Sequence, residues 1–198
     1  MPIRVTTIIS SLARCRDLVR RLPQRARLVA LLVVLAEEAA LVWRIGSHTE
    51  LAGYLVFGVV GWMISLFDLT ERRVPNVVVL PAYPVLLGLF LVAAAADGQW
   101  DRLLRGVLAL AVLVGCFGGL ALLAPRGLGL GDVKLAGLVG LCCGYLGWSA
   151  VMLAFVLSFG FGALLVALLV CIRRADRGTH IPFAPLLVAG AIVAILLR

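Results

Sequence analysis

The sequence has little of what most catalytic and metal sites require. Among its 198 residues there are two histidines, 10 acidic residues and five cysteines. The cysteines are odd in number, form no CxxC pair and lie mostly inside apolar runs, which argues against a disulfide framework or a zinc site and indicates packing residues. The GxSxG, HExxH and P-loop motifs are also absent, so nothing points to a serine hydrolase, a zinc metalloprotease or a P-loop enzyme.

Apolar residues, by contrast, are in excess. Hydrophobic residues make up 63% of the chain and the mean hydropathy is +1.13, far above the values of a soluble domain. The net charge is +8, but the basic residues lie in the N-terminal tail and between apolar runs, not in one soluble patch. We therefore expect an all-α polytopic membrane protein that binds no nucleic acid.

The apolar runs predict about seven transmembrane helices. Residues 1–27 carry seven arginines and one acidic residue, which predicts either a basic cytoplasmic tail or a helix lying on the anionic membrane surface. Residues 28–198 are predicted to form one integral membrane domain. Its expected spans are 28–45, 51–67, 77–96, 103–124, 132–148, 149–172 and 181–197.

The distribution of basic residues predicts the orientation of these spans. With the N-terminus in the cytoplasm, 14 of the 18 basic residues lie on the cytoplasmic side and four lie outside. This asymmetry follows the positive-inside rule. The same topology brings Asp68, at the end of the second span, and Asp132, at the start of the fifth, to one depth at the cytoplasmic membrane edge.

These two aspartates are the candidate catalytic residues. Asp132 follows a glycine-rich segment, GLGLGDVKL, in which Gly129 and Gly131 let the chain bend sharply as it re-enters the membrane. Asp68 begins the segment DLTERRVPN, in which Pro75 and Asn76 break one helix and start the next. Two neighbouring carboxyl groups in dehydrated surroundings share one proton, which is the arrangement of aspartic proteases. Each aspartate taken alone is more often a helix cap or a topology anchor.

Three segments of the sequence also resemble one family. GLGLGDVKL resembles the GxGD signature of membrane aspartyl proteases, in the GxGDxK form of type IV prepilin peptidases. DLTERRVPN is similar to that family's first aspartate motif, and IPFAPLLVAGA at 181–191 to its C-terminal segment, with Ala184 where the family often has glycine. Glu37 and Glu38, halfway along the first span, belong to none of these motifs. We expect them to be protonated or hydrogen-bonded and packed inward, and a working role is left open.

The resemblance implies an enzyme of the bacterial inner membrane that removes the basic leader from precursors of type IV pilins, pseudopilins or Tad-type pilins. Asp68 and Asp132 would be its catalytic pair, with no metal or cofactor needed for proteolysis. Long members of the family carry a double CxxC zinc domain, which this chain lacks, and also methylate the new N-terminus with S-adenosylmethionine; methylation by this chain is left open.

The remaining interpretations concern partners and rival functions. Lys134 is predicted to contact lipid phosphate or an acidic residue of the substrate, or else to anchor the topology at the membrane surface. A proton-coupled transporter and a non-catalytic subunit of a pilus or secretion apparatus are the alternative functions. The sequence does not indicate an oligomeric state.

Overall fold

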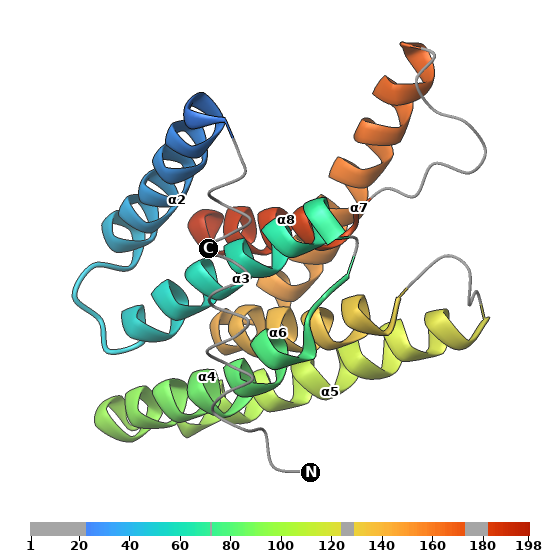
Figure 1. Cartoon of the computed structure of the whole chain (residues 1–198). Helices are drawn as coiled ribbons and strands as arrows, with labels where there is room; N and C mark the ends of the chain where they lie inside the picture. Colours follow the sequence, from blue (N-terminus) through green and yellow to red (C-terminus); the bar gives the residue numbers. More distant parts are fainter. Residues whose placement is uncertain (1–22, 72, 124–128, 173–181) are drawn as a thin grey trace.

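The computed structural model describes residues 23–71, 73–123, 129–172 and 182–198. These residues form seven α-helices, arranged as a bundle in Figure 1. The predicted surface tail up to residue 22, the beginning of the glycine-rich loop at 124–128 and the basic loop at 173–181 lie outside the described residues. The helices are α2 (Gln24–Ile45), α3 (Leu51–Glu71), α4 (Asn76–Asp97), α5 (Trp100–Leu123), α6 (Leu130–Leu146), α7 (Trp148–Cys171) and α8 (Ala184–Leu197).

Each predicted span corresponds to one of these helices, so the all-α prediction is confirmed. The largest shifts are at the start of α2, which begins at Gln24 instead of residue 28, and at the end of α3, which continues to Glu71 instead of ending at residue 67. Four of the described helices, α3, α4, α5 and α7, are long and apolar enough to cross a membrane, while α8 is apolar but has only 14 residues. Seven membrane crossings, and a loop that re-enters the membrane, stay predictions.

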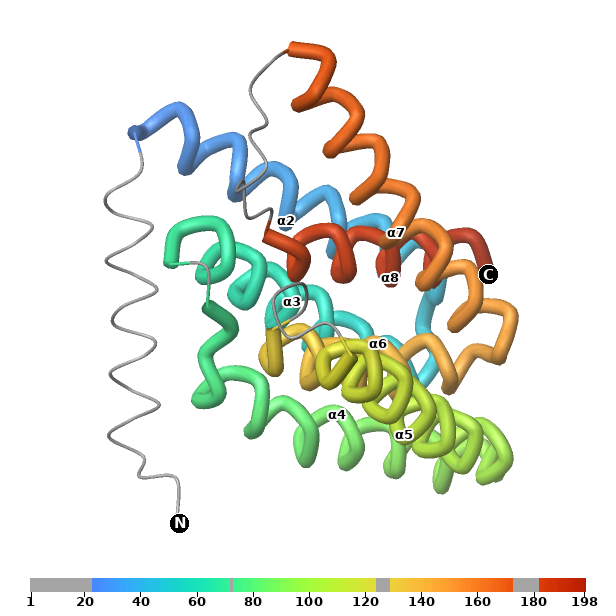
Figure 2. Tube along the Cα trace, turned by 90° about the vertical axis from the view of Figure 1, so that its right-hand side faces the viewer, coloured from blue at the N-terminus to red at the C-terminus, as the bar shows by residue number. Residues whose placement is uncertain are grey.

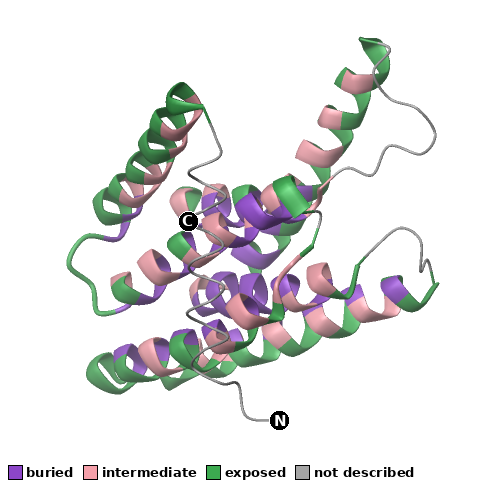
Figure 3. Ribbon diagram, in the orientation of Figure 1, coloured by how far each residue is buried: buried purple, intermediate pink, exposed green. Residues whose placement is uncertain are grey.

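Helix α6 forms the centre of the bundle. Every residue from Leu135 to Tyr145 is buried, and α6 packs against α5 along most of its length and against α3, α4, α7 and α8 elsewhere. Figure 3 shows this burial as a nearly continuous purple helix. By contrast, α7 buries only Ala150, Val151, Ala154 and Ser158. An apolar helix that leaves most of its surface exposed is suited to lipid rather than to water.

In the sequence, Gly137, Gly140, Gly144 and Gly147 recur at three- and four-residue spacing, which predicts one face of small residues for close helix contact. In the structure, three of them let α6 approach its neighbours closely. A Cβ atom at Gly140 would lie 2.7 Å from the carbonyl oxygen of Ala109, and one at Gly144 would lie 3.0 Å from Cα of Gly106. A Cβ atom at Gly137 would likewise clash, with side chains of α4 and α5. The prediction that Gly147 belongs to the same packing face is wrong, because Gly147 ends α6 with a φ of 156° and lets the chain turn directly into α7.

The cysteines divide between the core and the outer surface. Cys142 and Cys143 are completely buried in α6, which confirms their interpretation as packing residues. Cys116 and Cys171 are exposed on α5 and α7, so that interpretation is wrong for these two. The reason is that apolar runs here build the outer faces of the helices as well as the core. Cys15 lies outside the described residues.

The α5–α6 contact generates a stability prediction. Gly140→Ala should destabilise the protein by about 1–3 kcal/mol, because the new methyl group meets backbone atoms of α5 that cannot move aside locally. Gly115→Ala is the matched control, since a Cβ atom there has no neighbour within 4 Å. Thermal unfolding in detergent should show a lower Tm for Gly140→Ala alone. Equal Tm values for the two variants would contradict this packing.

Candidate functional site

Asp68 lies in the last turn of α3, where it meets the beginning of α8. Its side chain is buried, with 7% of its surface exposed, and its Oδ2 accepts a hydrogen bond from the backbone N–H of Ala184 at 3.1 Å. Ala184 is the first residue of α8, so the carboxyl group occupies the position at a helix N-terminus that favours an anion. This bond joins two of the three segments that carry the family resemblance.

Asp132 lies in the first turn of α6 and is half-buried. Its Oδ2 accepts a hydrogen bond from the backbone N–H of Gly129 at 3.2 Å, so that the side chain caps the start of its own helix. Each of the two candidate carboxyl groups is therefore held by one main-chain donor at a helix start. The two carboxyl groups lie near enough for the charge of Asp68 to act on Asp132.

Close packing around Gly131 brings the two aspartate segments together. A Cβ atom at Gly131 would lie 2.6 Å from Cβ of Val74, a distance that side-chain atoms do not tolerate. Glycine at this position thus allows the segment that follows Asp68 to rest directly on the start of α6. Figure 2 shows the end of α3 and the beginnings of α4, α6 and α8 on the same side of the molecule.

Pro75 and Asn76 occupy the positions expected of them. Pro75 is the N-cap of α4, its carbonyl oxygen accepts the N–H groups of Val78 and Val79 at 3.0 and 3.2 Å, and Asn76 is the first helical residue. The predicted break between the second and third helices is confirmed. The sharp reversal brings the start of α4 beside the start of α6.

Lys134 joins α6 to α4. Its Nζ donates a hydrogen bond to Oδ1 of Asn76 at 2.7 Å, and its carbonyl oxygen accepts one from the hydroxyl group of Tyr83 at 2.5 Å. Lys134 therefore links the two aspartate segments. This link could not be predicted from the sequence, because no motif relates Asn76 to Lys134. An ammonium group has three donors, so contact with lipid or substrate stays a prediction.

Glu37 and Glu38 lie elsewhere, on α2 beside Gly58 of α3. Gly58 precedes Asp68 by ten residues, about 15 Å along the helix, so these acids belong to a different depth of the bundle. Within the described chain, Oε1 of Glu37 and both carboxyl oxygens of Glu38 are buried without a hydrogen-bond partner. The inward packing is confirmed for these atoms, and their role stays open.

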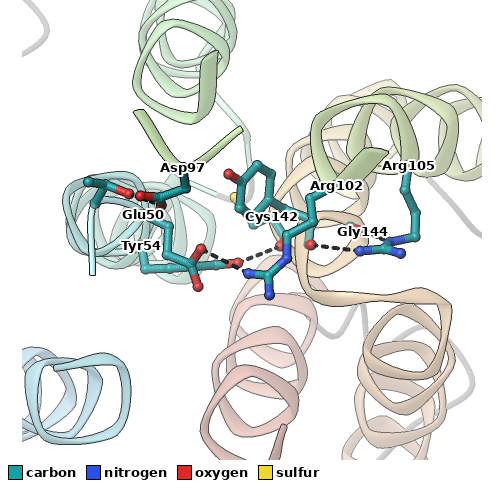
Figure 4. A network of polar contacts seen from close by, with 9 residues as sticks. Glu50, Tyr54, Asp97, Arg102, Arg105, Cys142 and Gly144 are labelled. Atoms are coloured by element: carbon teal, nitrogen blue, oxygen red, sulfur yellow. Dashed lines mark hydrogen bonds and ion pairs between the residues drawn. The ribbon is translucent and has the colours of Figure 1, made fainter. Parts of the chain in front are cut away.

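A second polar cluster lies at the opposite end of α3 from Asp68 (Figure 4). Arg102 pairs with Glu50 at 3.2 Å, and Arg105 donates to the carbonyl oxygens of Gly144 and Tyr145 at 3.0 and 3.3 Å. These carbonyls are at the end of α6, where a helix leaves its last acceptors unpaired. The cluster borders a cavity of about 750 Å³ and holds the far end of α6 in place.

The described residues offer no metal site, because no group of three His, Cys, Asp or Glu side chains among them has the required arrangement. Two carboxyl groups that share a site have a chemistry of their own. One, when ionised, accepts a proton from water, and the other, when protonated, donates a hydrogen bond to a carbonyl oxygen. This is acid–base chemistry suited to hydrolysis of a peptide bond.

Comparison with known proteins gives a consistent picture. Residues 55–168, which include both aspartates, match the model of the type IV leader peptidase family. The prepilin leader peptidase/N-methyltransferase of Stutzerimonas stutzeri is 30% identical over 159 residues, which cover 78% of this chain and 52% of that protein. The protein of the same name from Pseudomonas aeruginosa is 34% identical over 140 residues, covering 67% of this chain and 45% of that protein.

A third relative carries the same name. The prepilin leader peptidase/N-methyltransferase of Bacillus subtilis is 30% identical over 153 residues, which cover 77% of this chain and 58% of that protein. The chain spans about half the length of the curated relatives it matches. No solved structure matches it significantly. The matched family model covers more than half of the sequence, and the chain belongs to the type IV leader peptidase family.

Proposed function

We propose that this protein is a membrane aspartyl endopeptidase that removes the basic leader from precursors of type IV pilins, pseudopilins or Tad-type pilins. The observation that supports the proposal is that Asp68 and Asp132 each accept a main-chain hydrogen bond at a helix start, near enough for the charge of Asp68 to act on Asp132. The family and the names of its relatives support the substrate class.

In the proposed mechanism the two aspartates share one proton, because two like charges at close range cannot both form easily. The ionised member removes a proton from a water molecule as its oxygen attacks the carbonyl carbon of the scissile bond. The protonated member keeps its proton and donates a hydrogen bond to the carbonyl oxygen, on which negative charge develops. As the carbon–nitrogen bond breaks, the leaving amine takes up a proton from the pair, which returns to its starting state.

The location of the pair fits the chemistry of such a precursor. The scissile bond lies between a basic leader and a long apolar segment, so it reaches the surface of the membrane. Asp68 is in the last turn of α3 and Asp132 in the first turn of α6, which places both at helix ends. The leader stays in the cytoplasm while the apolar segment enters the bilayer.

We propose seven membrane helices in the bacterial inner membrane, with the N-terminus in the cytoplasm. The distribution of basic residues supports this orientation. The 17 residues of α6 are few for a membrane helix, but other helices surround α6, so lipid does not set its length. Membrane lipid is then a partner of the outer helices.

Proteolysis in this proposal uses no metal and no other cofactor, since the two aspartates supply both the base and the acid. Methylation with S-adenosylmethionine is not part of the proposal, because this chain matches only about half the length of the relatives named for it. The oligomeric state is likewise left aside. A proton-coupled transporter is less well supported, because the two motif aspartates meet at one end of the bundle rather than midway through it.

The dyad predicts that Asp68→Asn and Asp132→Asn each abolish cleavage. Asparagine keeps the size and the acceptor oxygen of aspartate but cannot carry the shared proton, so the rate should fall at least about 10² to 10⁴-fold. The double variant should be hardly worse than either single one, because the pair acts as a unit. The measurement is mass spectrometry of precursor N-termini after incubation with purified variants.

Matched controls separate catalysis from folding and from metal chemistry. Glu37→Gln and Glu38→Gln should keep most of the activity, and all four variants should purify with normal yield and Tm. A chelator in the same assay should leave cleavage unchanged. Near-normal activity of a well-folded Asp68 or Asp132 variant, or loss with chelator and rescue by zinc, would overturn the mechanism.

The proposed orientation is tested by labelling. A cysteine placed at position 179, between the last two helices, should react with a membrane-impermeant reagent only after the cytoplasmic side is opened, because this basic segment is predicted inside. The background should lack the exposed residues Cys116 and Cys171. Labelling of position 179 in intact cells would show that the orientation is reversed.

A further inference from the structure

Helix α2 is attached to the bundle mainly through its C-terminal half. Its buried residues are Leu41 and Ile45, while the apolar side chains between Leu28 and Leu35 are largely exposed. It packs against α3 and α8. In Figure 1 its first turns stand away from the other described helices, at the end where α3 finishes and α8 begins.

A groove of about 360 Å³ lies between α2, α3 and α8. Each helix contributes residues three, four or seven positions apart, so the walls are three helical stripes that run along the groove. Examples are Val33 and Glu37 from α2, Trp62 and Leu69 from α3, and Ala189 from α8. The lining is apolar apart from Glu37 and a serine of α3.

One end of this groove reaches the candidate dyad. Leu69, in the wall formed by α3, directly follows Asp68. Pro185, in the wall formed by α8, directly follows Ala184, whose N–H group binds the Asp68 carboxyl group. A chain lying in the groove therefore leaves it beside the carboxyl group of Asp68, the first member of the candidate dyad.

We propose that this groove binds the apolar helix that follows the scissile bond of the precursor. This inference rests on the proposed function and names the surface that recognises the substrate. An occupant must be apolar along its length, must continue as polypeptide into the dyad, and must present one helical face to three helical stripes. The segment after the cleavage site meets all three requirements.

Ala189 allows the groove to be blocked without disturbing the core. Its side chain is exposed within the groove, so Ala189→Trp should fill the space between α2, α3 and α8. Ala111→Trp is the matched control, because Ala111 is exposed on α5, away from the groove. Both variants should purify with a normal Tm.

With a full-length precursor, Ala189→Trp should raise KM at least about tenfold with little change in kcat, while Ala111→Trp should behave like the wild type. A short peptide that ends soon after the cleavage site should be cut equally well by all three proteins. Equal KM values for the two tryptophan variants with the full-length precursor would overturn the proposal.

Crosslinking locates the occupant independently of cleavage. A photoreactive residue in place of Ala189, in the Asp68→Asn background, should attach to the apolar segment of the precursor, and one in place of Ala111 should not. Attachment only to lipid would overturn the proposal that the groove binds the precursor. Failure of the wild type to cut any precursor would instead contradict the proposed function, and crosslinks at position 189 without cleavage would leave the groove as a binding site.

Discussion

Buried carboxyl groups need hydrogen-bond donors, and this need determines how the helices meet at one end of the bundle. A carboxyl group among apolar helices is costly unless donors reach it. The structure supplies one main-chain N–H to each aspartate, from Ala184 for Asp68 and from Gly129 for Asp132. Both donors lie at helix starts, so the ends of three helices must converge for the pair to exist.

The two ends of α6 are held by different means, and both serve this convergence. Near Asp132, Gly131 admits Val74 and Lys134 binds Asn76, so the first aspartate segment is fixed to the second. At the far end, Arg105 binds the last carbonyl groups of α6. The apolar side chains in the first half of helix α2 are largely exposed, and the groove lies between α2, α3 and α8.

The sequence predicted the helices well, because long apolar runs determine them in a membrane, while the catalytic role of Asp68 and Asp132 stays a prediction. The break at Pro75 was equally predictable, since proline and asparagine act locally. The bond from Ala184 to Asp68 and that from Lys134 to Asn76 were not predictable, because they join residues 116 and 58 positions apart. Gly147 was misjudged because its spacing is that of a packing glycine, while its backbone conformation makes it a turn.

The central claim is that Asp68 and Asp132 act as one acid–base pair with a single shared proton. The most direct test is the pH dependence of kcat/KM for cleavage of one precursor by the purified enzyme. Our account predicts a bell-shaped profile, because the pair is inactive both when it has lost its proton and when it carries two. A profile that stays flat on the acidic side, in an enzyme shown to remain folded there, would contradict it.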